Sequence, residues 1–246
     1  LNDKSKGAKY INSDSSDLYQ KSKVLYGMHL AKKEIKKVDF CYVVEGYTDV
    51  MALFQFGIKN VVSSCGTALT KDQIRLIHRF TSNIGILFDA DSAGVTATLK
   101  AIDEILKEGM NPKILQLPNS EDPSSFIQKN TKENIRTYIK EKMLNFIDFK
   151  YQLIEKEDTD SLIKTTKSIM ASIALINDPI AQSFHIKEAA KKLDLNELDL
   201  IKELDLQNQT HRKESIRKEK RTEIKNDPET SLNFELISKK FLEELQ

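Results

Sequence analysis

The sequence predicts an α/β fold, in which a mostly parallel sheet flanked by helices is followed by a helical subdomain. Short apolar runs alternate with helix-like segments in the first half of the chain. Continuous apolar runs of about five residues are typical of strands buried on both faces, and intervening helices make neighbouring strands parallel. All eight glycines lie at or before Gly109. Because helices avoid glycine, the second half is expected to be helical.

The apolar runs locate the elements of the first half. We expect strands at about residues 40–44, 60–64, 84–88 and 113–117, with helices at about 49–56, 70–81 and 92–108. Thr70 is the expected N-cap of the second of these helices, because Gln73 follows at the capping-box spacing. Before the sheet, apolar residues recur at helical spacing from Asp17 to Ile35, which predicts one continuous helix.

The second half is expected to form several helices, at about residues 131–156, 159–177, 179–193 and 196–206. Asp178 followed by Pro179 is typical of a helix start, with aspartate as N-cap and proline in the first turn. The stretch after residue 206 is nearly devoid of large apolar residues until about residue 232, where helical periodicity returns. The chain begins with Leu1, and we expect it to be a fragment of a longer protein.

Composition restricts the function only weakly. The net charge is +1, but both ends are locally basic. Residues 1–39 hold nine basic and five acidic residues, and residues 211–225 hold seven and three. Such patches suit a polyanion, although a solvated surface is the commoner explanation. Cys41 and Cys65 lack CxxC spacing, which argues against a zinc site and a disulfide framework. Without a signal peptide or a long apolar span, the expected location is cytoplasmic, with no membrane partner.

Acidic residues follow three of the predicted strands. Glu45 ends the first apolar run, Asp89 and Asp91 end the third, and Asp122 follows the fourth. Parallel strands present their carboxyl ends at one edge of the sheet, so these side chains are expected to converge. Clustered carboxylates raise one another's pKa unless a cation neutralises them, and Mg²⁺ prefers oxygen ligands. Two such ions about 3.5–4 Å apart can hold both oxygens of a phosphoryl displacement. The pattern therefore indicates metal-assisted chemistry on phosphate.

Each acidic residue has a second interpretation. Glu45 is a candidate metal ligand or general base. Asp49 can bind metal, or it can stabilise the start of the next helix through the helix dipole. Asp89 and Asp91 are two residues apart and point the same way in extended backbone, so both can reach one ion. Asp122 precedes Pro123 and is extended, either in the same acidic cluster or in a simple Asp-Pro turn.

Three further residues are candidates for backbone contacts to a ligand. Gly46 allows the chain to turn sharply or to approach a ligand closely. Gly66 and Thr67 lie in a turn that opens onto a helix, where backbone N–H groups can hold a phosphate. The glycine signal alone is weak.

The ordered motifs resemble a known family. Glu45-Gly46-Tyr47-Thr48-Asp49, followed by Asp89-Ala90-Asp91-Ser92-Ala93-Gly94, is similar to the Toprim domain of topoisomerases, primases and some nucleases. The surrounding sequence resembles bacterial DnaG-type primase over about residues 9–205, and the motifs that carry this are Lys9-Tyr10-Ile11-Asn12-Ser13, Leu25-Tyr26-Gly27, Ser64-Cys65-Gly66-Thr67-Ala68-Leu69-Thr70, Gln73-Ile74-Arg75-Leu76-Ile77, Leu117-Pro118 and Glu121-Asp122-Pro123.

The resemblance implies a division of the chain. Residues 1–36 are the end of the preceding polymerase subdomain and a linking helix, 37–130 the Toprim α/β domain, 131–206 a helical bundle, 207–230 a charged linker, and 231–246 the start of a truncated helical region.

It also implies an activity, the synthesis of short RNA primers from ribonucleoside triphosphates on a single-stranded DNA template, with Mg²⁺ or Mn²⁺. By this resemblance the metal site comprises Glu45, Asp49, Asp89, Asp91 and Asp122, with Glu45 also assisting deprotonation. Lys9, Lys21 and, more weakly, Asn12 contact phosphates. The family has a second acid two residues after Asp122, where this chain has Ser124. Zinc is expected only in an amino-terminal module, and the replicative helicase binds a carboxy-terminal domain. Neither is complete in this chain.

Two alternatives remain open. The first is a Toprim nuclease or topoisomerase-like strand cleaver, which needs a nucleophilic tyrosine near the metals; Tyr47 lies within the motif. The second is a non-catalytic module that binds a helicase through residues 211–225 and 232–245. Primer synthesis distinguishes the main hypothesis from both.

Overall fold

The computed structural model describes residues 13, 16, 17, 19–65, 68–118, 123–154 and 158–210. The chain divides into two compact units, before and after Leu195, and in the second unit residues 197–210 are helical. The strands are β1 (Cys41–Val44), β2 (Val61–Ser63), β3 (Asn83–Leu87), β4 (Asn111–Leu115) and β5 (Met143–Asn145). The helices are η1 (Lys21–Lys23), α1 (Met28–Val38), α2 (Tyr47–Gln55), α3 (Lys71–His78), α4 (Ser92–Lys107), α5 (Pro123–Lys129), α6 (Lys132–Lys142), α7 (Phe146–Gln152), α8 (Thr159–Ala174) and α9 (Pro179–Leu193).

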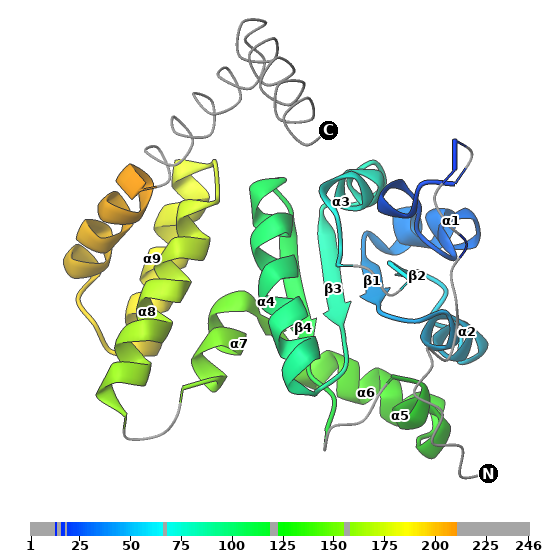
Figure 1. The fold of residues 1–246 in the computed structure, drawn as a ribbon. Helices are drawn as coiled ribbons and strands as arrows, with labels where there is room; N and C mark the ends of the chain where they lie inside the picture. The colour runs from blue at the N-terminus through cyan, green and yellow to red at the C-terminus, as the bar shows by residue number, and fades with distance from the viewer. Residues whose placement is uncertain are drawn as a thin grey trace, which may run out of the picture. The chain divides into compact units, whose positions relative to one another are not determined.

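The sheet has the strand order β2-β1-β3-β4-β5, and the helices of the first half lie around it (Figure 1). β1 to β4 pair in parallel, whereas β5 pairs antiparallel with β4. From β1 the chain passes through α2 to β2 on one side, and from β3 through α4 to β4 on the other. The strand order therefore reverses between β1 and β3, which is the switch point where open α/β sheets bind ligands.

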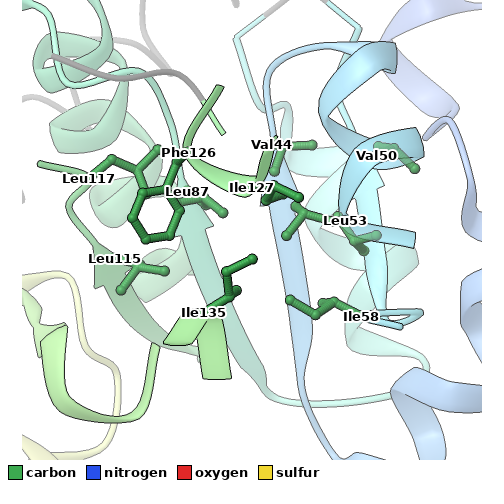
Figure 2. Packing of buried hydrophobic residues seen from close by; sticks show 11 residues of the cluster. Val44, Val50, Leu53, Ile58, Leu87, Leu115, Leu117, Phe126, Ile127 and Ile135 are labelled. Atoms are coloured by element: carbon green, nitrogen blue, oxygen red, sulfur yellow. The ribbon is translucent and has the colours of Figure 1, made fainter. Parts of the chain in front are cut away.

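One face of the sheet packs against α2, α5 and α6. Side chains from β1, β3 and β4 meet those of the three helices in a continuous apolar cluster (Figure 2). The members of this cluster are Val44, Val50, Leu53, Ile58, Val61, Leu87, Leu115, Leu117, Phe126, Ile127 and Ile135. Full burial of each such side chain is worth about 1.5–3 kcal/mol. The cluster fixes α2 and α5, which follow β1 and β4, against the sheet.

The opposite face is covered in part by α4. Ile84 and Ile86 alternate with Leu87 along β3, so they point away from the first cluster. α4 contacts β3 and β4 and buries Ile102 and Ile105 completely. In Figure 1, α4 runs in front of β4 and beside β3. The helix that starts beside the switch point is thus held along its length by the sheet.

The four predicted strands of the first half and the three helices between them are confirmed to within about three residues. The Thr70 cap is confirmed, because its Oγ1 accepts the Gln73 N–H at 3.2 Å and its own N–H donates to Gln73 Oε1 at 3.0 Å. The Asp178 cap is also confirmed, since its carboxylate accepts the N–H of Ile180 at 2.9 Å. Among the described residues, no helix is long and apolar enough to span a membrane.

The prediction of one helix from Asp17 to Ile35 is wrong. Among the described residues before α1, only the 3-10 turn η1 is helical, and α1 begins at Met28. Gly27 has φ = +83°, which stops a helix from continuing through it. Just before it, the backbone of Tyr26 pairs with that of Ser63 in an isolated antiparallel bridge. Tertiary pairing and a left-handed glycine therefore override helical periodicity.

The prediction of one helix over 131–156 is also wrong. Its middle, Met143–Asn145, is the strand β5, which pairs with β4. Asn145 then caps α7, because its Oδ1 accepts the N–H of Asp148 at 2.8 Å. The segment expected to be purely helical thus contributes the antiparallel edge of the sheet.

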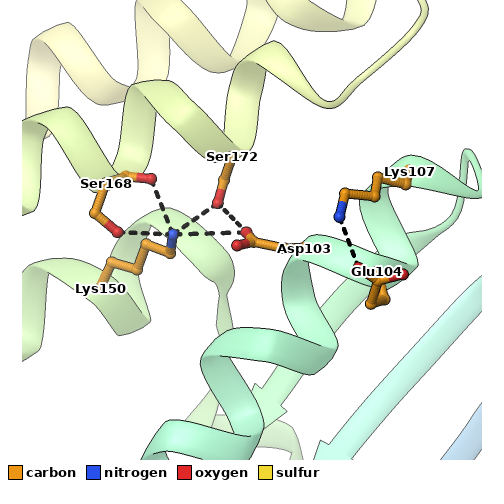
Figure 3. Close-up of polar contacts among 6 residues, drawn as sticks. All are labelled: Asp103, Glu104, Lys107, Lys150, Ser168 and Ser172. Carbon is orange, nitrogen blue, oxygen red and sulfur yellow. Dashed lines mark hydrogen bonds and ion pairs between the residues drawn. The ribbon is translucent and has the colours of Figure 1, made fainter. Parts of the chain in front are cut away.

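A buried lysine joins α7 and α8 to α4. The Lys150 side chain is nearly inaccessible, and its Nζ donates to the carbonyl and the hydroxyl of Ser168 and to Ser172 Oγ, at 2.9, 3.0 and 2.6 Å (Figure 3). Asp103 on α4 lies 3.8 Å from the same Nζ and accepts the Ser172 hydroxyl. Burial lowers the pKa of Lys150, and Asp103 opposes this. The hydrogen bonds offset the cost of placing the ammonium in the interior.

Candidate functional site at the sheet switch point

Glu45 and Asp89 lie at the switch point. Glu45 directly follows β1, and Asp89 comes two residues after the end of the neighbouring strand β3. The backbone N–H of Asp89 donates to Glu45 Oε1 at 3.3 Å. The two chain segments that carry these acids are therefore connected directly, although 44 residues separate them.

Glu45 sits in an environment that resists its ionisation. It is half-buried, and burial is the largest of the effects that raise its pKa. The hydrogen bond from Asp89 lowers the pKa, whereas the negative charges of Asp91 and Asp49 raise it. The carboxylates from the ends of β1 and β3 are thus close enough to repel. A cation, or a shared proton, would relieve this repulsion.

Asp49 is buried and hydrogen-bonded on both oxygens. Its Oδ2 accepts the N–H of Gly46 at 3.0 Å, which closes the first turn of α2. Its Oδ1 accepts the hydroxyl of Ser124, in α5, at 2.8 Å. A Cβ on Gly46 would lie 2.9 Å from Asp49 Oδ2, so any side chain at this position would displace the capping carboxylate. Asp49 therefore holds together the segments that follow β1 and β4.

Asp91 and Gly94 form the start of α4. Asp91 Oδ1 accepts the N–H of Gly94 at 2.7 Å, and the Asp91 side chain is otherwise exposed. A Cβ on Gly94 would lie 2.0 Å from the Asp89 carbonyl oxygen, so no side chain fits there. The glycine lets α4 begin directly against the backbone that carries Asp89.

Ser63 connects the loop after β2 to the carboxyl end of β1 by a hydrogen bond. Ser63 Oγ donates to the Glu45 carbonyl oxygen at 2.7 Å and accepts the N–H of Cys65 at 2.9 Å. Cys65 has φ = +60°. The contact fixes the direction in which the chain leaves β2. The sequence contains no recognisable signal for it, nor for the hydrogen bond of Ser124 to Asp49.

An open cavity of about 770 Å³ adjoins the acids. It begins at Glu45 and runs along α4, with Leu69 and Phe88 on its walls. Ser92, Thr96 and Lys100 line it from α4. Its volume lies within the range typical of small-ligand sites.

The structure places some of the predicted site residues and not others. It brings Glu45 together with Asp49, Asp89 and Asp91. Lys21 lies in η1, where its carbonyl accepts Gln73 Nε2 at 3.0 Å, so its backbone is fixed against α3. The remaining candidates lie outside the described residues, and these are Lys9, Asn12, Gly66, Thr67 and Asp122.

The described acids fit a divalent ion that takes few protein ligands. Within the described part of the chain, no three or more His, Cys, Asp or Glu side chains form a group that could hold a metal by itself. Mg²⁺ needs only one or two carboxylates when substrate phosphates and water complete its octahedron. The repulsion on Glu45 and the exposed Asp91 carboxylate suit such a site, whereas Asp49 already has hydrogen-bond donors on both oxygens.

The surroundings of Tyr47 do not activate it as a nucleophile. Burial and then a hydrogen bond with Cys65 raise the pKa of its hydroxyl, and Tyr19 acts in the same direction. Its ring packs edge-on against Tyr26, with centroids 4.8 Å apart. A nucleophilic tyrosine needs a lowered pKa or an adjacent base.

Comparison with known proteins agrees with this geometry. Residues 42–127, which contain all of β1 except Cys41, the strands β2 to β4 and all four described acids, match the Toprim-like family. A DNA primase of Clostridium acetobutylicum is 37% identical over 193 residues, or 77% of the chain. The chain is a homologue of DNA primases. It spans about a third of the length of the curated primases that it matches, covering 32% of the Clostridium protein.

Solved primase structures share the fold. The zinc-binding and RNA polymerase domains of the Aquifex aeolicus primase match with a TM-score of 0.69 and 33% identity, over 79% of this chain and 47% of that one. A DnaG primase catalytic domain bound to single-stranded DNA matches with a TM-score of 0.68 and 26% identity, over 80% of this chain and 64% of that one. The predicted Toprim-type fold and the primase resemblance are both confirmed.

Proposed function

We propose that this chain is the catalytic region of a DNA primase, which joins ribonucleotides into short RNA primers on single-stranded DNA. The observation that carries the proposal is the meeting of Glu45 and Asp89 at the switch point, with Asp91 and Asp49 close enough to act on the pKa of Glu45. The primase homologues support the substrate class, and the matching catalytic domain with single-stranded DNA supports the template.

The proposed reaction is a nucleotidyl transfer. A 3′-hydroxyl attacks the α-phosphate of the incoming ribonucleotide, the new phosphodiester bond forms, and pyrophosphate leaves with the electrons of the broken P–O bond. Glu45 accepts the proton of the attacking hydroxyl, and its raised pKa makes it a better base once it is ionised. Mg²⁺ or Mn²⁺, held by Asp89, Asp91, Glu45 and Asp122, would supply positive charge for the phosphate oxygens. Asp49 orients the loop that carries Glu45.

Other residues bind substrate in this proposal. Lys9, Lys21 and Asn12 contact phosphates, Gly66 and Thr67 offer backbone N–H groups, and Gly46 lets the backbone approach the ligand closely. The domain divisions at residues 36, 130, 206 and 230 are part of the same proposal, as are the binding of an RNA primer and of a replicative helicase outside this chain. Zinc belongs to an amino-terminal module of the longer protein.

The test is template-dependent synthesis from labelled ribonucleotides in Mg²⁺ or Mn²⁺, with the full 246-residue chain. Glu45→Gln and Asp89→Asn each keep side-chain volume and remove one charge. We expect each to lower the rate at least about 100-fold, the usual contribution of a positioned acid or base. Glu34→Gln, on α1, is the matched control and should retain full activity. Equal activity in all variants contradicts the proposal, and cutting of the template without synthesis favours the nuclease alternative.

A further inference from the structure

A second cavity lies at the opposite end of β1 from Glu45. Phe40, which directly precedes β1, lines it, and so do residues 57–60, which directly precede β2. Its other walls come from α1 and α6. The volume is about 360 Å³, at the lower end of the range typical of ligand sites. It shares no lining residue with the cavity beside the acids.

The apolar part of the lining comes from four separate segments of the chain. Its side chains are Val38, Phe40, Tyr42, Ile58 and Ile139. The rings of Phe40 and Tyr42 pack against each other, with centroids 4.9 Å apart. A Cβ on Gly85 would lie 2.6 Å from the Phe40 ring, so this glycine of β3 leaves room for the two rings. Val38 is 46% exposed, so part of this apolar lining faces water.

Three cations accompany the apolar lining. Lys59 comes from the segment before β2, and Arg136 and Lys140 lie four residues apart on α6, so they share one face of that helix. All three are exposed, and none forms an ion pair with a carboxylate of the described residues. The acids of α6, Glu133 and Glu141, are not among the described residues that line the cavity.

Glu34 is the acid of the described lining. Lys37 contacts its carboxylate at 3.4 Å and opposes its charge. Asp39 follows Val38 in sequence but is directed elsewhere, because its carboxylate accepts the Thr81 hydroxyl at 2.7 Å and the Asn83 amide at 3.1 Å. The described lining therefore carries three positive charges against one negative charge, and it attracts anions.

We propose that this cavity binds an acidic segment of a partner protein, in which one large apolar side chain enters the cavity and flanking carboxylates contact the three cations. An apolar centre with a polar rim is the usual anatomy of a protein interface, and arginine is enriched there. A nucleotide fits less well, because the polar edge of its base would meet mostly apolar side chains. The amide of the lining residue Asn60 already donates to the Phe40 carbonyl at 2.8 Å.

The test is binding of the fluorescein-labelled peptide Asp-Asp-Phe-Asp-Asp to the full 246-residue chain, measured by fluorescence anisotropy at several salt concentrations. Two further peptides replace phenylalanine by alanine, or every aspartate by asparagine. Arg136→Gln combined with Lys140→Gln removes two charges from the cavity. Lys142→Gln is the matched control, because Lys142 lies two residues beyond Lys140 and so on the opposite face of α6. Val38→Ser reduces the apolar lining at constant charge, and thermal unfolding checks that each variant is folded.

We expect the double glutamine variant to weaken binding about tenfold at low salt, the combined effect of two exposed ion pairs, and to differ little from the unaltered chain at high salt. Val38→Ser and the alanine peptide should each weaken binding about threefold or more at every salt concentration. Lys142→Gln should bind like the unaltered chain. Arg136→Glu combined with Lys140→Glu should lose the acidic peptide and gain Lys-Lys-Phe-Lys-Lys, a reversal that misfolding cannot produce.

Four results would overturn the inference. These are no saturable binding to the unaltered chain, unchanged affinity in the double glutamine variant, equal affinity for the asparagine peptide, and displacement of the peptide by ATP or by an oligothymidylate, which would make the cavity a nucleotide or nucleic-acid site. Glu45→Gln distinguishes this inference from the proposed function, because it should abolish primer synthesis and leave peptide binding intact.

Discussion

Replacing Gly94 by alanine tests how tightly the site is built. In an ordinary helix this change gains about 1 kcal/mol, because alanine is the better helix former. Here the new Cβ would lie 2.0 Å from the Asp89 carbonyl oxygen, where ordinary contact begins at 3.4 Å. The obstacle is backbone, which cannot rotate away like the end of a side chain. Overpacking of this kind costs typically 1–3 kcal/mol, and rigid backbone favours the upper end.

The net effect of Gly94→Ala is therefore a loss of about 2 kcal/mol, which lowers the thermal midpoint by about 4–8 °C. The variant must also move the backbone of Asp89, whose N–H donates to Glu45, so Mn²⁺ binding should weaken along with stability. The assays are calorimetry and electron paramagnetic resonance of bound Mn²⁺.

The adjacent Ala93→Gly variant is the matched control. Ala93 is exposed in the same turn of α4, so the change should cost at most about 1 kcal/mol and leave Mn²⁺ binding as it was. If Gly94→Ala were as stable as the unaltered chain, the close approach of α4 to Asp89 would be refuted.

Three further variants test separate parts of the structure. Glu45→Gln should become more stable than the unaltered chain as the pH rises from about 4.3, the ordinary pKa of glutamate, through the raised pKa of Glu45. Over this range ionisation of Glu45 destabilises the folded unaltered chain, and the variant has no such group to ionise. Equal dependence of the unfolding free energy on pH in the two proteins would contradict this. Lys150→Met should lower the free energy of unfolding, measured in urea, by about 1–3 kcal/mol, because the polar groups around Lys150 lose their hydrogen-bond donor. An unchanged urea midpoint would show that these groups find other hydrogen-bond partners. Ser124→Asp replaces the hydroxyl that now lies 2.8 Å from Asp49 Oδ1 by a second carboxylate beside Asp49. It should therefore lower the melting temperature without metal and enlarge the stabilisation by Mn²⁺. Identical melting with and without Mn²⁺ would exclude a metal there.

Local sequence patterns were enough to predict those strands and helix caps whose structure depends mainly on their own residues. The apolar run before Glu45 is a buried parallel strand, and the Thr70 capping box forms as its spacing indicates. Because parallel strands end at the same edge of a sheet, the sequence also predicted that the acids after β1 and β3 would lie near one another.

Other features depend on partners far away in the sequence. Met143–Asn145 becomes a strand only because β4 offers an unpaired edge, and Tyr26 is extended because it bridges to Ser63. Neither partner can be identified from local periodicity. The same holds for Ser124, which reads as a missing acid in the sequence and is a hydrogen-bond donor to Asp49 in the structure.

The proposed nucleotidyl transfer requires divalent ions at the carboxylates that follow β1 and β3. Anomalous diffraction from a crystal soaked in millimolar Mn²⁺, with a ribonucleoside triphosphate present, tests it most directly. We expect an anomalous peak within coordination distance of Asp89 and Asp91 that disappears in Asp89→Asn. A crystal that shows the nucleotide without Mn²⁺ at these acids, or Mn²⁺ bound only elsewhere, would contradict it.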